Sequence, residues 1–233
     1  MTDRDYSGQP GAAVGESKTV YAPRVKVCGL MTTEDCALMN EVRPDYVGFV
    51  FAHTRHFLTD AQAAGLRAAL DPGIPAVGVF VDEEIPHIVS LVEAGTIQLV
   101  QLHGSEDAAY IADLRAALAD RTDAGIPFIR AARVRTGEEP LAAQAMDCEY
   151  LLLDAYDPTL PGGSGRRLRL DLIPPLSKPC FVAGGLSADN VAEVIAAVHP
   201  WGVDVSSSLE TTDPDGVLHK DRDRVLRFMN AVK

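Results

Sequence analysis

One carboxylate stands where it could do chemistry. Asp154 directly follows the apolar run EYLLL, and the chain then continues into GGSG, with three glycines among four residues. A carboxylate at the end of a buried strand can serve as an acid or base at the rim of a pocket, under a glycine-rich loop (157–165) that closes as a lid. An ordinary surface turn has the same composition, because Asp and Gly are common turn residues. The surrounding elements decide between the two.

Short apolar runs alternate with longer amphipathic segments along most of the chain. There are eight runs, which recur roughly every 25 residues: RVKVCG, DYVGFVF, IPAVGVFV, IQLVQLHG, IPFIRAARV, EYLLLDA, KPCFVAGG and GVDVSSS. The segments between them have helical spacing, and one is expected to begin at Ser187 as its N-cap. Continuous apolar strands joined by helices predict a parallel sheet.

Eight such units favour a single (β/α)8 TIM barrel over a doubly wound sheet. The first run lacks the G-x-G-x-x-G turn that usually follows the first strand of a doubly wound fold. We expect the barrel to form one catalytic domain over residues 24–233, preceded by a disordered extension over residues 1–23, which are polar and rich in small residues.

Composition narrows the possible partners. The formal net charge of −12 argues against nucleic acid as a partner, whereas a small phosphorylated ligand remains compatible with local amides and basic groups. No run reaches the about 18 apolar residues of a membrane span, and no signal peptide is evident. The four cysteines lack the spacing of a metal site, so we expect reduced thiols in a cytoplasmic protein. We expect the protein to be a monomer or a homodimer.

In a (β/α)8 barrel, active sites form where the strands end. The residues at the predicted strand ends are Cys28, Phe51, Phe80 to Asp82, Gln101, His103, Ala131 to Arg133, Asp154, Gly184, Gly185 and Asp204 to Ser207.

Five of these strand ends carry motifs in order: KVCGL, QLHG, LLLDA followed by GGSG, VAGGLSADNV and GVDVSSSLE. Together they resemble the phosphoribosylanthranilate isomerase family of tryptophan biosynthesis, from about residue 26 to the C-terminus. The resemblance implies an Amadori rearrangement of N-(5-phosphoribosyl)anthranilate without metal or organic cofactor. It assigns the base to Cys28 and the acid to Asp154, so we expect a lowered pKa for the thiol and, from the neighbouring leucines, a raised pKa for the carboxyl.

The resemblance also implies where the substrate binds. The phosphate is expected at the last loops of the barrel and at the glycine-rich segment, on Gly163, Gly184, Gly185, Ser206 and Ser207. Asp204 would take a ribose hydroxyl, while Gln101 and His103 face the same mouth and are candidates for either substrate contact or a structural role.

Two positions depart from the family pattern. The loop FAHTRHFLT is shorter than usual and places His56 where relatives have the arginine for the anthranilate carboxylate, with Arg55 just before it. Either residue could bind the carboxylate; we favour Arg55, because only arginine offers a permanent bidentate fork. Ser208 and Leu209 replace the usual Gly and Val beside the phosphate, where a side chain could tighten or crowd the site.

Other barrel proteins remain alternatives. A sister isomerase of histidine biosynthesis performs the same rearrangement with paired aspartates, which Cys28 argues against. A pentose phosphate epimerase would need a metal-binding set of histidines and carboxylates, of which the strand ends supply only His103. A non-catalytic barrel that binds a phosphorylated ligand has no need for an acid and a base at opposed strand ends.

Overall fold

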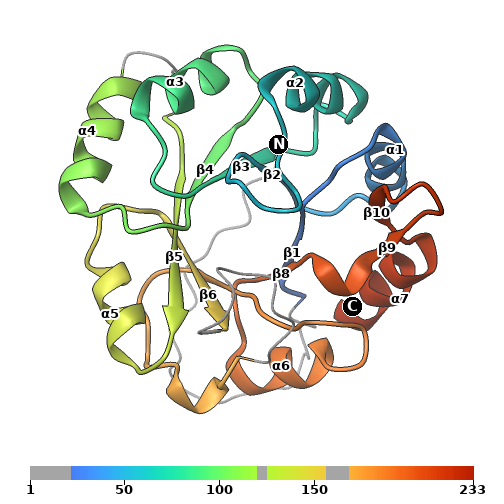
Figure 1. Ribbon diagram of the computed structural model, residues 1–233. Helices are drawn as coiled ribbons and strands as arrows, with labels where there is room; N and C mark the ends of the chain where they lie inside the picture. The colour runs from blue at the N-terminus through green and yellow to red at the C-terminus, as the bar shows by residue number, and fades with distance from the viewer. Residues whose placement is uncertain (1–21, 120–124, 156–167) are drawn as a thin grey trace.

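The computed structural model describes residues 22–119, 125–155 and 168–233. Eight parallel strands close into a barrel in chain order (Figure 1), which confirms the predicted (β/α)8 fold. The strands are β1 (Arg24–Cys28), β2 (Tyr46–Val50), β3 (Ala76–Phe80), β4 (Leu99–Leu102), β5 (Phe128–Val134), β6 (Tyr150–Ala155), β7 (Cys180–Val182) and β8 (Gly202–Val205). Of the extension predicted over residues 1–23, all but the last two residues lie outside the described part.

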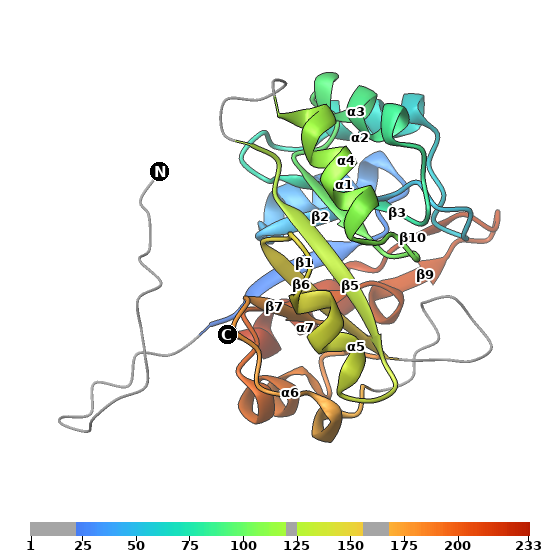
Figure 2. The ribbon, with the colours of Figure 1, turned by 90° about the vertical axis from the view of Figure 1, so that its left-hand side faces the viewer.

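The helices surround this barrel (Figures 1 and 2). They are α1 (Thr33–Val42), α2 (Asp60–Ala69), α3 (Ile85–Glu93), α4 (Ala108–Leu118), α5 (Glu138–Gln144), α6 (Val191–Val198) and α7 (Arg222–Val232). Between β6 and β7 the described residues form only the short 3-10 helix η1 (Leu170–Leu172). None of the described helices is long and apolar enough to cross a membrane.

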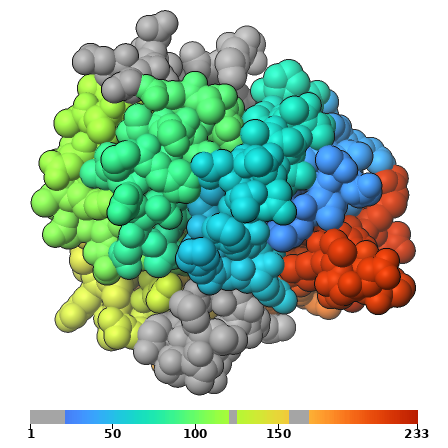
Figure 3. All heavy atoms as spheres, turned by 45° about the horizontal axis from the view of Figure 1, so that its top comes forward, coloured from blue at the N-terminus to red at the C-terminus, as the bar shows by residue number. Residues whose placement is uncertain are grey.

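The chain after β8 contains an element that the sequence analysis did not predict. A 3-10 helix, η2 (Ser207–Leu209), leads into an antiparallel hairpin of β9 (Glu210–Thr212) and β10 (Leu218–Lys220). The hairpin lies beside α1 and the loop after β2, as the space-filling view shows (Figure 3). The last loop of the barrel is thereby held against the first two units.

Local capping explains several of the helix starts. Thr32 and Thr59 each form a capping box with the third residue of the helix, Asp35 and Gln62 respectively. The prediction of Ser187 as the N-cap of α6 is wrong, because the N-cap residue is Asn190. Asn190 Oδ1 accepts the backbone N–H of Ser187, which holds the intervening residues as a turn instead.

The direction of side chains along the strands decides which residues reach the mouth. One buried cluster fills the barrel interior: Val77, Leu99, Ile129, Ala131, Leu152, Phe181 and Ala183. Since side chains alternate between the two faces of a strand, the residues two positions further along also point inward. The polar residues among these are Gln101, Arg133 and Asp154, which therefore line the carboxyl end of the barrel.

Candidate active site

Cys28 ends β1 inside the barrel mouth. Its side chain packs in a small apolar cluster with Val50 and Val79. Gly48 on β2 is in register with Cys28, and a Cβ atom there would lie 2.5 Å from the sulfur. A glycine at this position therefore makes room for the thiol.

A buried ion pair lies beneath this thiol. Lys26 is fully buried, and its Nζ donates to Asp204 Oδ1 over 2.9 Å. Burial alone would lower the pKa of Lys26, but the negative charges of Asp204 and of the Cys28 thiolate raise it, so the ammonium form persists. The positive charge of Lys26 also acts on the Cys28 thiol and opposes the rise in its pKa that burial causes.

The structure contradicts the expected lowering of the Cys28 pKa, because the pKa of this thiol is raised. Burial raises the pKa of the thiol, while the positive charges of Lys26 and Lys220 oppose that rise without overcoming it. The apolar neighbours that enclose the sulfur disfavour its anion. The adjacent ammonium of Lys26 is thus the main feature that favours a thiolate here.

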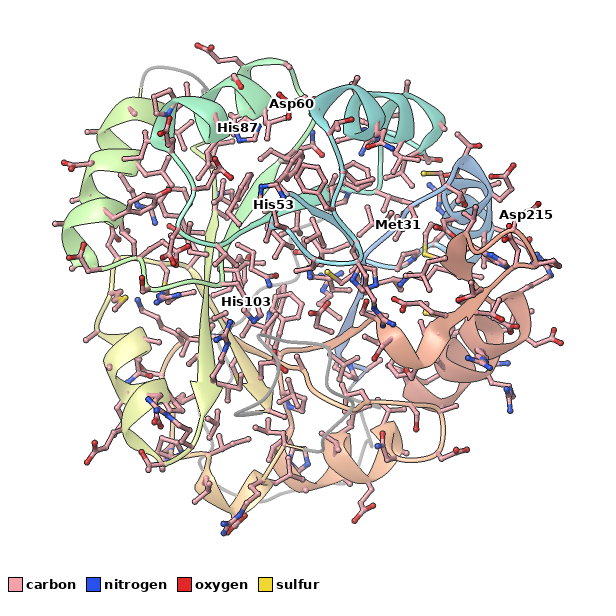
Figure 4. The ribbon with its side chains drawn as sticks, in the orientation of Figure 1. Met31, His53, Asp60, His87, His103 and Asp215 are labelled. Carbon is pink, nitrogen blue, oxygen red and sulfur yellow. The ribbon has the colours of Figure 1, made fainter. Side chains whose placement is uncertain are left out.

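Asp154 on β6 is brought together with two other predicted residues. Its Oδ2 lies 3.4 Å from His103 Nε2, and Gln101 Nε2 donates to His103 Nδ1 over 2.9 Å. Because the amide nitrogen only donates, a neutral His103 holds its proton on Nε2, directed at Asp154. Figure 4 shows His103 near the centre of the ring of strands. The imidazole is placed to orient the carboxyl.

The loop after β7 passes close to this carboxyl. Gly184 has φ +88° and Gly185 has φ +62°, a region that favours glycine. A Cβ on Gly184 would lie 3.0 Å from Asp154 Oδ1, so the predicted phosphate loop and the predicted acid are immediate neighbours. Asn190 Nδ2 donates to the Gly185 carbonyl and fixes the loop.

The predicted serines follow β8, facing that loop. Ser206 and Ser207 begin the segment that contains η2. The Ser208 hydroxyl donates to the backbone carbonyl of Leu186. Ser208 therefore ties the loop after β8 to the loop after β7. Gly163 and the predicted lid lie outside the described residues.

Glu210 gathers a charged cluster at the β2 side of the mouth. Its Oε1 accepts from Lys220 Nζ at 2.8 Å and from the Ser206 hydroxyl at 3.0 Å, and lies 2.8 Å from His56 Nε2; its Oε2 accepts from Arg55 at 2.7 Å. Burial opposes ionisation, yet the His56 hydrogen bond and the charge of Lys220 lower the Glu210 pKa to about 2.

Arg55 and His56, the two candidates for binding the anthranilate carboxylate, differ in how deeply their side chains are buried. The side chain of Arg55 is 54% exposed, whereas that of His56 is 12% exposed. A Cβ on Gly29 would lie 2.9 Å from His56 Cδ2, so His56 lines the mouth beside the end of β1. Both side chains already bind Glu210.

Sequence reasoning missed three residues of this arrangement: Lys26, Glu210 and Lys220. The first had a signal, because Lys26 is two residues before Cys28 and so shares its face of the strand. Lys220 had none; its Nζ also donates to the Cys28 carbonyl, 192 residues away in the sequence.

Chemistry-bearing residues elsewhere do not join this site. His87 on α3 bonds to Asp60 on α2 over 2.8 Å at the periphery of the barrel (Figure 4). Within residues 22–119, 125–155 and 168–233, no three or more His, Cys, Asp or Glu side chains are grouped so as to hold a metal ion.

The fold and the position of these groups define the class: a (β/α)8 barrel with an acid–base cluster at the carboxyl ends of its strands. The family model of N-(5′-phosphoribosyl)anthranilate isomerase matches residues 25–231. The chain belongs to this family, as its sequence motifs suggested.

Individual relatives agree. The N-(5′-phosphoribosyl)anthranilate isomerase of Endomicrobium trichonymphae is 37% identical over 211 residues, covering 91% of this chain and 98% of the relative. A phosphoribosylanthranilate isomerase solved with reduced 1-(o-carboxyphenylamino)-1-deoxyribulose 5-phosphate has a TM-score of 0.69 at 29% identity, covering 90% of this chain and 98% of that one. The structure of monomers generated from the dimeric phosphoribosylanthranilate isomerase of Thermotoga maritima has a TM-score of 0.70 at 29% identity. It also covers 90% of this chain and 98% of that one.

Proposed function

We propose that this protein catalyses the isomerisation of N-(5′-phosphoribosyl)anthranilate to 1-(o-carboxyphenylamino)-1-deoxyribulose 5-phosphate in tryptophan biosynthesis. Membership of the isomerase family over residues 25–231 carries the proposal. The inward-facing pair of Cys28 on β1 and Asp154 on β6, with β7 and β8 between them, supports it.

The reaction needs an acid and a base in turn. Asp154 would protonate the ribose ring oxygen, which opens the ring to an imine at C1. The Cys28 thiolate, beside the Lys26 ammonium, would then remove the proton from C2. The resulting enolamine tautomerises to the ketose. His103 would hold the Asp154 carboxyl in position throughout the reaction.

The substrate would extend across the mouth from its phosphate. Support for a phosphate site at Gly184, Gly185, Ser206 and Ser207 comes from the left-handed glycine backbone after β7, beside the 3-10 helix after β8. Lys26 engages only one oxygen of Asp204 by a hydrogen bond, which is compatible with a ribose hydroxyl on the other.

The finer assignments remain predictions. Arg55 or His56 as partner of the anthranilate carboxylate would have to act beside the negative charge of Glu210. Four free cysteines agree with a protein of the reducing cytoplasm, and the dimeric relative makes a homodimer as reasonable as a monomer.

Loss of phosphoribosylanthranilate fluorescence in the presence of purified protein tests the function directly. We expect turnover that persists in EDTA, because the proposed steps are proton transfers between side chains and substrate. No turnover of this substrate, or turnover only of the aminoaldose of histidine biosynthesis, would reject the proposal.

A further inference from the structure

An arginine on β5 faces the mouth and belongs to none of the clusters described above. Arg133 follows Ile129 and Ala131 at intervals of two, and both of these fill the barrel interior. Side-chain alternation therefore turns Arg133 inward, one layer above them. The residue is half-buried and is the next-to-last residue of β5, at the carboxyl end of the barrel.

This guanidinium has unused hydrogen-bonding capacity. The Nε atom is buried and has no hydrogen-bond partner. Among the described residues no carboxylate forms an ion pair with Arg133, although Asp154 lies in register with it on the neighbouring strand. Arg130 on the same strand is different: it faces outward and donates to Leu102 O, Gly104 O and Glu106. A buried donor of a charged group without a partner is unfavourable, so Arg133 is suited to an anionic ligand.

The geometry of the substrate limits where its carboxylate can lie. The ring oxygen that Asp154 would protonate and the anilino nitrogen are bonded to the same carbon, C1, and the carboxylate is ortho to that nitrogen. The carboxylate is therefore only a few bonds from the acid. Arg133 and Asp154 are in register on the adjacent strands β5 and β6, which lie about 4.8 Å apart. The Arg133 side chain therefore leaves the backbone one strand away from Asp154.

Other cations at the mouth are already engaged. Arg55 and His56 bind Glu210, and Lys26 is paired with Asp204. A carboxylate at the first two would meet the negative charge of Glu210, whereas no described acid pairs with Arg133.

We propose that Arg133 binds the anthranilate carboxylate of the substrate and thereby determines specificity for a carboxylated aryl group. The proposal rests on the proposed function. It assigns to β5 a contact that the shortened loop after β2 was expected to provide.

Binding of two unreactive ligands tests the inference separately from turnover. One ligand is reduced 1-(o-carboxyphenylamino)-1-deoxyribulose 5-phosphate, and the other is the same compound without its carboxylate. The Kd of each is measured by calorimetry. We expect wild type to prefer the carboxylated ligand, and Arg133→Met to weaken its binding by roughly 10- to 100-fold while changing the Kd of the other less than about threefold. Arg133→Lys should retain part of the preference.

Arg135→Met is the matched control, because this nearby exposed arginine pairs with Glu139; it should leave both Kd values unchanged. Arg55→Met should preserve the preference for the carboxylate. Equal weakening of both ligands by Arg133→Met, or a preference that survives this change and disappears in Arg55→Met, would overturn the inference. Wild-type protein that binds the reduced product but does not turn over phosphoribosylanthranilate would reject the proposed function alone.

Discussion

The reactivity of Cys28 depends on two opposed influences at the scale of single residues. Enclosure by Val50, Val79 and the backbone of Gly48 raises the thiol pKa, and the ammonium of Lys26 opposes this. The thiolate is the basic form, and the charge of Lys26 is the largest influence that favours it. Asp204 in turn keeps Lys26 charged.

The roles of base and acid are tested by removing each group. Cys28→Ala and Asp154→Ala should each lower kcat by about 10²- to 10⁴-fold while KM stays within several-fold, because proton transfer is lost and binding is kept. Steady-state fluorescence kinetics measure both parameters. Near-normal turnover in either variant would remove that residue from its assigned role.

Lys26→Met should move the Cys28 titration to higher pH. Without the Lys26 charge, the effect of burial on the thiol is opposed less, so the Cys28 pKa rises further. As a result, kcat/KM at neutral pH falls by about tenfold or more. The pH dependence of thiol alkylation and of kcat/KM reports the shift.

Lys178→Met provides the control for this change, since Lys178 lies 3.6 Å from the sulfur of another thiol, Cys148, away from the mouth. Because Asp204 would be left buried without its cation, melting temperatures must accompany the kinetics. An alkylation profile of Cys28 identical to wild type would contradict the role of Lys26.

At the scale of elements, the loops after β7 and β8 are tied to each other before any ligand binds. Asn190 fixes the Gly185 carbonyl from the start of α6, and Ser208 in η2 donates to Leu186 O. Holding both loops in one geometry lowers the entropy lost when a phosphate is bound. The serine that departs from the family pattern thus joins two loops of the same site.

Ser208→Ala should loosen this connection. Loss of one hydrogen bond of about 1 kcal/mol predicts a KM raised by roughly fivefold with little change in kcat. Ser90→Ala on α3 removes a similar hydroxyl-to-carbonyl bond far from the mouth and should leave KM unchanged. A KM for Ser208→Ala equal to that of Ser90→Ala would show that the tie does not support binding.

At the scale of the whole molecule, Glu210 joins segments that are distant in the sequence. Its carboxylate binds Arg55 and His56 after β2, Ser206 after β8 and Lys220 in the hairpin. The first and last units of the barrel are thereby connected at their carboxyl ends. The charge state of one buried carboxyl should influence the stability of the whole fold.

Acid unfolding tests this influence. The Glu210 pKa falls from its ordinary value near 4.5 to about 2 in the native state. The unfolded chain therefore takes up the proton first, and about 3 kcal/mol of stability, present above pH 4.5, is lost as the pH falls toward 2. Denaturant unfolding from pH 7 to 2 should show a shallower pH dependence for Glu210→Gln. Glu41→Gln, at an exposed pair with Arg222, should follow wild type.

The sequence by itself determined the fold and the family, and it singled out the pair of groups proposed as base and acid. Eight continuous apolar runs could be buried on both faces only in a parallel sheet with crossover helices, and this rule is local in the chain. Cys28 and Asp154 could be chosen as candidates because each ends one of these runs, where barrel enzymes form their sites.

Only the tertiary structure decided the electrostatics around them. Lys26 and Asp204 are 178 residues apart in the sequence, and their pairing follows from the closure of β1 against β8. The rise of the Cys28 pKa depends on how completely its neighbours enclose the sulfur, and the engagement of His56 by Glu210 depends on the hairpin after β8. Such contacts have no local sequence signal, because they arise from packing between elements that meet only when the barrel closes.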